Sequence, residues 1–238
     1  MAGTDGGRRS SLLLVSAEPD VGFYASRVPQ LPGPVLVLGS GRGRVALGLA
    51  ERGFTVQGVE PSERMMEVAN FILAEQPTDI VARVRLLHAD LRSIRLPERF
   101  PAVFAPENAL GLVRSLGDLD GFLASVLHHL APGGVFCLDI LGPANPGSDV
   151  EPQSALEKDG HGLKEPKRPL FRPHLRSRKD APSRGGAIHR LTLRAFTIEE
   201  LQGALESHGL HALERYGNFT SKPFAPEDGL QVLVCSRL

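Results

Sequence analysis

The feature that most restricts the fold of this chain is a short apolar run, Pro34–Leu38, which ends in the glycine-rich stretch Gly39–Gly43 (GSGRG). The run is too short for a helix and apolar throughout, which is typical of a strand buried on both faces of a parallel sheet. The three glycines let the backbone turn tightly and approach a ligand closely. The pattern predicts a strand, a ligand-binding turn and then a helix.

Strand and helix patterns alternate from residue 18 to residue 141. Strands are expected at 34–38, 54–60, 84–88, 103–105 and 135–141, and helices at 18–30, between Val45 and Gly53, at 62–76 with Ser62 as cap, and at 119–130. Alternation at this spacing is typical of right-handed strand–helix–strand units in a parallel sheet. The sequence therefore predicts an α/β fold in one domain, residues 18–238, preceded by a flexible tail, residues 1–17.

Residues 142–186 break the alternation, because they are rich in Pro, Gly and charge and have almost no apolar periodicity. They predict a long excursion from the sheet. Residues 188–196 alternate as in an edge or cover strand. Thr197 and Glu200 form a capping-box pattern that opens a helix ended by Gly209. Two last strands are expected at 210–216 and 230–236.

The composition excludes several classes of protein. The chain has 27 Lys and Arg against 27 Asp and Glu, so its net charge does not attract polyanions as a whole. Both cysteines, Cys137 and Cys235, lie in apolar runs and are expected to be buried hydrophobic residues. No Cys/His spacing suits zinc, so no metal site is expected. No apolar segment matches a signal peptide or a membrane span, so the cytoplasm is the expected compartment.

The glycine-rich stretch is compatible with two classes of adenosyl cofactor, dinucleotides and S-adenosylmethionine. Arg44 stands where the dinucleotide fingerprint has a third glycine for close helix–strand packing. Glu60 ends the second predicted strand, where a carboxylate can accept hydrogen bonds from both ribose hydroxyls of either cofactor. A nicotinamide-dependent oxidoreductase is thereby disfavoured, and the chain also lacks a Tyr-x-x-x-Lys pair.

Four segments resemble, in order, the motifs of class I S-adenosylmethionine-dependent methyltransferases. They are Val35–Arg44, Gly58–Met65, His88–Leu91 and the turn Leu130–Phe136. The resemblance runs from about residue 20 to the C-terminus and is weakest in 142–186. It implies a Rossmann-like, seven-stranded, mostly parallel sheet of order 3-2-1-4-5-7-6, with helices on both faces and the last strand antiparallel. It also implies a methyltransferase domain at 18–238, in which 142–190 is an inserted cover over the substrate.

The resemblance further implies which residues bind the cofactor. Glu60 would hold the ribose hydroxyls, Pro61 and Met65 would sandwich the adenine, and Asp90 and the Leu91 backbone would pair with its edge. Pro106 lies in the segment that lines the methyl donor. The methionine and ribose portions would be lined by Gly39, Ser40, Gly41 and Gly43.

Three positions depart from the family pattern. Val37 stands where the family commonly has an acidic residue near the methionine end of the cofactor, so a charge partner is missing. Pro101 replaces a usual acid before the fourth strand, and Ser40 replaces a frequent Cys. The Val37 departure keeps open a relative that binds the cofactor without transferring methyl.

The catalytic candidates are Asn108, Tyr24 and His189. Asn108 follows the fourth strand, where its amide can orient a substrate or the cofactor amine, or cap a helix start. Its neighbour Glu107 can hold a cationic substrate or face water. Tyr24 and the histidines of the excursion, with His189 as the choice, are candidate bases for a hydroxyl or ammonium acceptor. Methyl transfer itself mainly requires an aligned nucleophile and exclusion of water.

The preferred methyl acceptor is a small molecule that is methylated on N or O. Residues 164–190 carry nine Lys and Arg against two acidic residues, a net charge of +7 that could follow phosphates, so an RNA or protein acceptor stays an alternative. Against nucleic acid, the fourth strand is not followed by the Asp/Asn-Pro-Pro-aromatic tetrad of base-amino methyltransferases, and few aromatic residues interleave with the basic ones.

Overall fold

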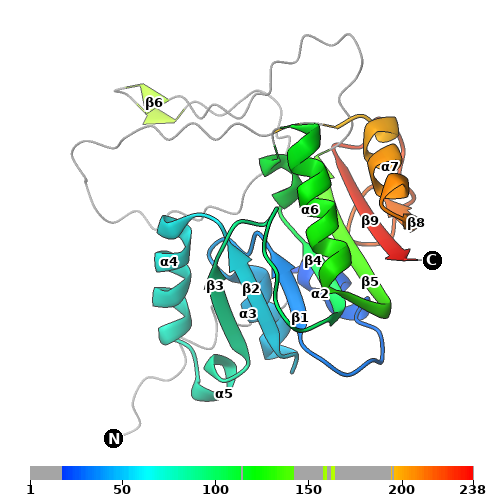
Figure 1. The fold of residues 1–238 in the computed structure, drawn as a ribbon. Helices are drawn as coiled ribbons and strands as arrows, with labels where there is room; N and C mark the ends of the chain where they lie inside the picture. The colour runs from blue at the N-terminus through cyan, green and yellow to red at the C-terminus, as the bar shows by residue number, and fades with distance from the viewer. Residues whose placement is uncertain are drawn as a thin grey trace, which may run out of the picture.

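The computed structural model describes residues 18–113, 115–141, 158–159, 162–163, 194 and 196–237. Seven strands form one sheet in the order β3-β2-β1-β4-β5-β9-β8, which confirms the expected order (Figure 1). The strands are β1 (Val35–Leu38), β2 (Val56–Glu60), β3 (Val84–His88), β4 (Phe100–Ala105), β5 (Leu130–Leu141), β8 (Leu210–Tyr216) and β9 (Leu230–Arg237). Strands β1 to β5 pair in parallel, and β9 is antiparallel to both of its neighbours.

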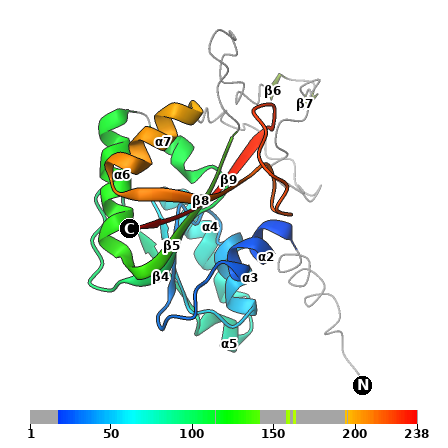
Figure 2. The ribbon, with the colours of Figure 1, turned by 90° about the vertical axis from the view of Figure 1, so that its right-hand side faces the viewer.

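Helices cover both faces of the sheet, as expected. They are α2 (Pro19–Ser26), α3 (Arg44–Glu51), α4 (Glu63–Ala74), α5 (Thr78–Val81), the 3-10 turn η1 (Ala109–Leu112), α6 (Leu116–His129) and α7 (Ile198–Ser207). Figure 2 shows α6 and α7 on one side of the sheet and α2 and α3 on the other.

The core lies in two layers, one on each face of the central strands. Residues of β1 alternate between the layers: Leu36 and Leu38 pack with Phe122 and Leu123 of α6, and Val35 and Val37 belong to the layer of α2 and α3. All four β1 residues are buried, which is the reason for a continuous apolar run instead of an alternating one.

The helix caps follow the sequence closely. Ser62 accepts a hydrogen bond from the Met65 amide at the start of α4, and Thr197 and Glu200 form the expected capping box at the start of α7. Gly53 and Gly209 follow their helices with φ of 92° and 67°, a conformation that glycine adopts without strain.

Several element ends differ from the sequence predictions. Strand β4 begins at Phe100 instead of residue 103, and β5 begins at Leu130 instead of residue 135. The two strands shift register between Phe100 and Ala102, so β4 continues through Pro101, which was expected to precede the strand. Helix α6 begins at Leu116, because Ser115 accepts from the Asp118 amide and caps it three residues earlier than expected.

Part of the expected strand 188–196 is contradicted. Arg194 and Phe196 are not in a strand, although the Arg194 amide donates to the Gly111 carbonyl at 2.8 Å and Phe196 is buried in the core. The rest of that strand, the tail 1–17 and the basic segment 164–190 lie outside the described residues. Within the expected cover 142–190, β6 (Lys158–Asp159) and β7 (Gly162–Leu163) form an antiparallel pair.

Candidate active site

The carboxyl ends of the five parallel strands bring the predicted site residues to one edge of the sheet. The glycine stretch follows β1, Glu60 ends β2, Asp90 follows β3 and Pro106 follows β4. Ligands of open α/β sheets bind outside this edge, at the point where the strand order reverses. Here the order reverses between β1 and β4.

The glycine stretch forms a tight turn over the end of β1. The amides of Gly39 and Ser40 both donate to the Val59 carbonyl, at 2.8 and 2.9 Å, which fastens the turn to β2. Gly39, Gly41 and Gly43 have φ of 74°, 56° and 86°, so each uses the left-handed conformation that L side chains disfavour. A Cβ on Gly39 would lie 2.6 Å from Ala109 Cβ, so only glycine lets η1 pack this closely.

Glu60 is held by the backbone around it. Its side chain is buried, and its two carboxylate oxygens accept from the amides of Gly41 at 2.8 Å and Ser62 at 2.9 Å. These bonds place the carboxylate between the glycine turn and the start of α4. Each carboxylate oxygen keeps further acceptor capacity, since an ionised carboxylate offers about four lone-pair positions.

The residues expected around the adenine lie beside Glu60. Pro61 is exposed and Met65 is half-buried, whereas its neighbour Met66 is buried in the core. A Cβ placed on Gly41 would lie 3.8 Å from Met65 Cε, so Met65 reaches over the glycine turn. Met65 therefore faces the turn, and Met66 has the core position.

Asp90 is half-exposed and bound by a neighbouring arginine. Arg92 donates to it from its backbone amide and its guanidinium, and reaches on to Asp118 at 2.5 Å. The hydrogen bonds from the Arg92 side chain lower the pKa of Asp90, which keeps the carboxylate ionised. Leu91 is buried under the glycine turn, and its Cδ1 would lie 3.7 Å from a Cβ on Gly39.

The segment after β4 has an uncommon backbone. Pro106 is buried, and the two residues that follow, Glu107 and Asn108, have φ of 56° and 57°. Positive φ at a residue other than glycine costs roughly 1 kcal/mol or more and persists only where the surroundings hold it. Asp139 of β5 holds it here, accepting from the amides of Glu107 at 2.9 Å and Asn108 at 3.2 Å.

Asn108 is buried, and its side chain is only partly hydrogen-bonded. Oδ1 accepts from the Leu141 amide at 3.2 Å, and Nδ2 has no hydrogen-bond partner among the residues described. A Cβ on Gly111 would lie 2.5 Å from that Nδ2, so glycine is required beside it. Asn108 thus ties the segment after β4 to the end of β5, and its Nδ2 group has no acceptor in the described part of the chain.

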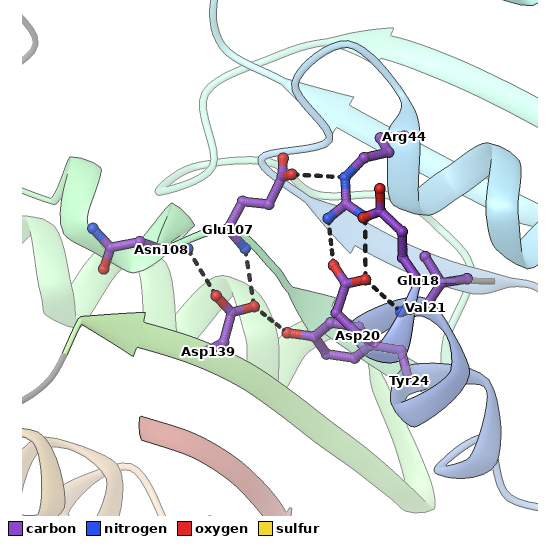
Figure 3. A network of polar contacts seen from close by, with 8 residues as sticks. All are labelled: Glu18, Asp20, Val21, Tyr24, Arg44, Glu107, Asn108 and Asp139. Carbon is purple, nitrogen blue, oxygen red and sulfur yellow. Dashed lines mark hydrogen bonds and ion pairs between the residues drawn. The ribbon is translucent and has the colours of Figure 1, made fainter. Parts of the chain in front are cut away.

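Tyr24 and Asp139 form a buried pair that links α2 to β5 (Figure 3). The Tyr24 hydroxyl donates to Asp139 Oδ1 at 2.5 Å, and neither side chain has more than 2% of its surface exposed. Burial, the Asp139 charge and that hydrogen bond raise the pKa of Tyr24, and burial raises the pKa of Asp139 to about 6. This environment does not support the expected role of Tyr24 as a base; its hydroxyl holds Asp139.

Asp139 is the main residue that the sequence analysis missed. It stands in Val135–Leu141, a run that is otherwise apolar. A carboxylate inside such a strand must find donors or neutralise, so its position alone marks it as unusual.

Arg44 gathers three carboxylates at the open end of the glycine turn (Figure 3). Its terminal nitrogens bond Glu18 and Asp20, and its Nε donates to Glu107 at 2.8 Å. The residue that marked a departure from the dinucleotide pattern thus joins α2, α3 and the segment after β4.

Histidines and metal-binding groups were also considered for the site. His189 lies outside the described residues. His129 is buried at the end of α6, where its Nδ1–H donates to the Ser125 carbonyl at 2.7 Å and its Nε2 accepts from the Leu96 amide, so it is structural. The part of the chain that the structure describes holds no group of three or more His, Cys, Asp or Glu suited to a metal ion. Nor does any helix there have the length and apolarity needed to cross a membrane.

The residues present fit an adenosyl cofactor. The turn at Gly41 leaves the space that a side chain would fill, and the Ser40 hydroxyl is buried without a hydrogen-bond partner in the described residues. Glu60 stands at the end of β2 with acceptor capacity for two hydroxyls.

Comparison with known sequences places a methyltransferase domain on this region. Residues 35–134 match the sequence family described as a methyltransferase domain. The Bacillus subtilis (strain 168) protein YqeM, which is named provisionally as a methyltransferase, is 29% identical over 109 residues. That match covers 45% of this chain and 42% of YqeM, less than half of either.

Solved structures share this fold. The CcbJ methyltransferase of Streptomyces caelestis superposes with a TM-score of 0.69 at 24% identity, over 92% of this chain and 88% of its own. The glycopeptide N-methyltransferase MtfA, solved with S-adenosylmethionine, superposes with a TM-score of 0.63 at 20% identity, over 92% and 93% of the two chains. These likenesses show the fold.

Proposed function

We propose that this chain binds S-adenosylmethionine and transfers its methyl group to a small molecule, because residues 35–134 match a methyltransferase domain family and the sheet has the order of the class I fold. The observation that carries the proposal is the pairing of the glycine turn with Glu60 at the reversal of strand order. A carboxylate that already binds the turn's own Gly41 amide fixes the distance between the turn and the ribose position.

Each predicted cofactor residue has a place in this proposal. Glu60 holds the two ribose hydroxyls, and Pro61 and Met65 lie against the adenine. Asp90, kept ionised by Arg92, accepts from the adenine amino group beside the Leu91 backbone. The turn itself lines the ribose and methionine portions through Gly39, Ser40, Gly41 and Gly43, and Pro106, directly after β4, lines the methyl donor.

S-adenosylmethionine, when bound, supplies a methyl group on a sulfonium, which is a good leaving group. An acceptor N or O that takes this methyl group would give up a proton, which a residue of the chain would have to accept. The protein's main task is alignment and exclusion of water. Asn108, whose buried Nδ2 has no hydrogen-bond partner among the described residues, is our candidate for orienting the acceptor, and His189 is our candidate for taking its proton.

A small-molecule acceptor is supported by the neighbouring structures, which include a glycopeptide N-methyltransferase. The acceptor's methylated atom, N or O, belongs to the same proposal. The alternative of an RNA or protein acceptor rests on residues 164–190, outside the described part of the chain.

Calorimetric titration of the full chain tests the cofactor proposal. S-adenosylmethionine and S-adenosylhomocysteine should bind and NADH should not. Glu60→Ala should weaken S-adenosylhomocysteine binding about 10-fold or more, because charge-assisted hydrogen bonds to the ribose are lost. The matched control is Glu63→Ala, an exposed acid in the first turn of α4, which should bind as the wild type does.

NADH binding without a response to the other two ligands would reject the proposal. Equal affinity in Glu60→Ala and wild type would show that the ribose is held elsewhere. Release of S-adenosylhomocysteine during incubation with pooled small-molecule amines and alcohols separates a transferase from a relative that only binds.

A further inference from the structure

The amino-acid end of the proposed cofactor carries an ammonium and a carboxylate, and the family's usual acid for this end is absent. Val37 stands in its place, fully buried in the apolar layer with α2 and α3. We infer that Glu107, from the segment after β4, receives the α-ammonium of the cofactor in this chain. The inference rests on the proposed function and extends it to a residue that the motifs do not mark.

The two oxygens of Glu107 face different partners. Oε1 accepts from Arg44 Nε at 2.8 Å, and Oε2 would lie 3.9 Å from a Cβ placed on Gly41. The side chain thus reaches from the segment after β4 across to the middle of the glycine turn. With 44% of its side-chain surface exposed, Glu107 is open to a ligand that lies in the turn.

The chemistry of the cofactor sets where this ammonium must lie. Its ribose and amino-acid end are joined through the sulfonium by a short chain, so a ribose on Glu60 leaves the ammonium a few bonds further along the turn. Glu60 accepts from the Gly41 amide, and Glu107 Oε2 would lie 3.9 Å from a Cβ placed on the same glycine. They therefore bracket the turn from two sides, as a ribose and an ammonium require.

Other carboxylates near the turn are less suited to the ammonium. Asp139 is buried and accepts from Tyr24 and two backbone amides. Glu18 and Asp20 bond the terminal nitrogens of Arg44, on the α2 side, and Asp20 is almost fully buried. Glu107 alone among these four acids combines an exposed side chain with an oxygen directed at the glycine turn.

The backbone of Glu107 is built to hold this direction. Its φ of 56° is uncommon for a glutamate, and Asp139 holds it through the Glu107 amide. Arg44 fixes the carboxylate from the other side. A side chain held at both ends is already in place before the ligand arrives, which reduces the ordering cost of binding.

Two ligands separate recognition of the ammonium from general damage to the site. S-adenosylhomocysteine carries the amino-acid end, and 5′-methylthioadenosine lacks it. Glu107→Gln keeps the size of the side chain and removes its charge. We expect Glu107→Gln to weaken S-adenosylhomocysteine binding about 10- to 100-fold and to leave methylthioadenosine binding within about 2-fold of wild type. Only S-adenosylhomocysteine has an ammonium that the Glu107 carboxylate can bind.

Glu18→Gln is the matched control, because Glu18 also bonds Arg44 but from the α2 side. Its affinity for both ligands should stay near wild type. An unchanged affinity of Glu107→Gln for S-adenosylhomocysteine would overturn the inference, and so would an equal loss for both ligands. The inference would also be overturned if Glu18→Gln weakened S-adenosylhomocysteine binding as much as Glu107→Gln does, because the charge of the whole cluster around Arg44 would then be responsible. Failure of the wild-type chain to bind either ligand would instead reject the proposed function.

Discussion

Asp139 is buried, and its carboxylate accepts hydrogen bonds from three donors. Three groups from two distant parts of the chain donate to it, the Tyr24 hydroxyl and the amides of Glu107 and Asn108. These bonds favour the ionised form, but burial outweighs them and raises the pKa to about 6. Asp139 thus holds the backbone of the proposed active site in place. Its carboxyl group gains or loses its proton in mildly acidic solution.

The raised pKa of Asp139 predicts a pH-dependent stability. The unfolded carboxyl has a pKa of about 3.9, so the folded state binds the proton more tightly. This stabilisation is complete below about pH 4 and is lost as the pH rises through 6, a change on the order of 3 kcal/mol. We expect the wild type to lose stability relative to Asp139→Asn from pH 4 to pH 6, with no further relative change at higher pH.

Urea unfolding of both proteins between pH 4 and pH 8 measures this difference. Asn also places an amide donor against three donors, so a pH-independent loss will lie beneath the effect. Tyr24 and the half-exposed Glu107 lie next to the Asp139 carboxylate but are present in both proteins. A stability difference that stays constant across the range, or grows in favour of the wild type, would contradict the expected pKa.

At the scale of the elements, the start of α7 is held by a capping box. The Thr197 hydroxyl accepts from the Glu200 amide at 3.1 Å, and the Glu200 carboxylate accepts from the Thr197 amide at 3.1 Å. Thr197→Ala should lower the free energy of unfolding by about 1 kcal/mol, because the first-turn amide loses its partner. Gln202→Ala, on the exposed face of the same helix, should change it by less than about 0.5 kcal/mol.

Chemical denaturation at neutral pH compares the two α7 variants. Equal losses would show that the cap contributes no more than any other surface contact of the helix.

Element ends were predictable where a local interaction sets them. Strand β3 and strand β8 have their expected bounds, and Ser62, Gly53 and Gly209 end or begin helices as their chemistry requires. The start of β4 was not predictable, because Pro101 locally disfavours a strand. Only its pairing with the first residues of β5, through a register shift, continues the ladder there.

On the scale of the whole molecule, Tyr24 forms a hydrogen bond with Asp139, which is 115 positions further along the chain. Its hydroxyl joins α2 to Asp139. Its ring packs against Phe104 and Phe219, with distances between ring centroids of 4.8 and 6.0 Å. Arg27 adds a second link from α2 to β8 through an ion pair with Glu214 at 2.7 Å. Helix α2 is thus fixed to both the centre and the far edge of the sheet.

Tyr24→Phe isolates the central link. We expect a loss of about 1.5–3 kcal/mol in unfolding free energy, because a buried carboxylate loses a donor. The control is Tyr216→Phe, whose hydroxyl donates to the partly exposed Glu214 at 2.9 Å and should matter less. Thermal and urea unfolding at neutral pH measure both, and equal losses in the two variants would show that the Asp139 bond is no stronger than a partly exposed one.

The sequence by itself determined the α/β class, the glycine turn, Glu60 at the end of β2 and the helix caps. These features depend on residues close together in the chain, whose spacing is the physical cause of the structure. Tertiary structure decided the rest. Only the packed sheet brings Tyr24, Glu107 and Asp139 together, buries a carboxylate among three donors, and turns Glu107 toward Gly41. The glycine turn could be predicted from the sequence because its residues are adjacent in the chain. The charged residues around it could not be predicted, because only the order of the strands in the sheet makes them neighbours.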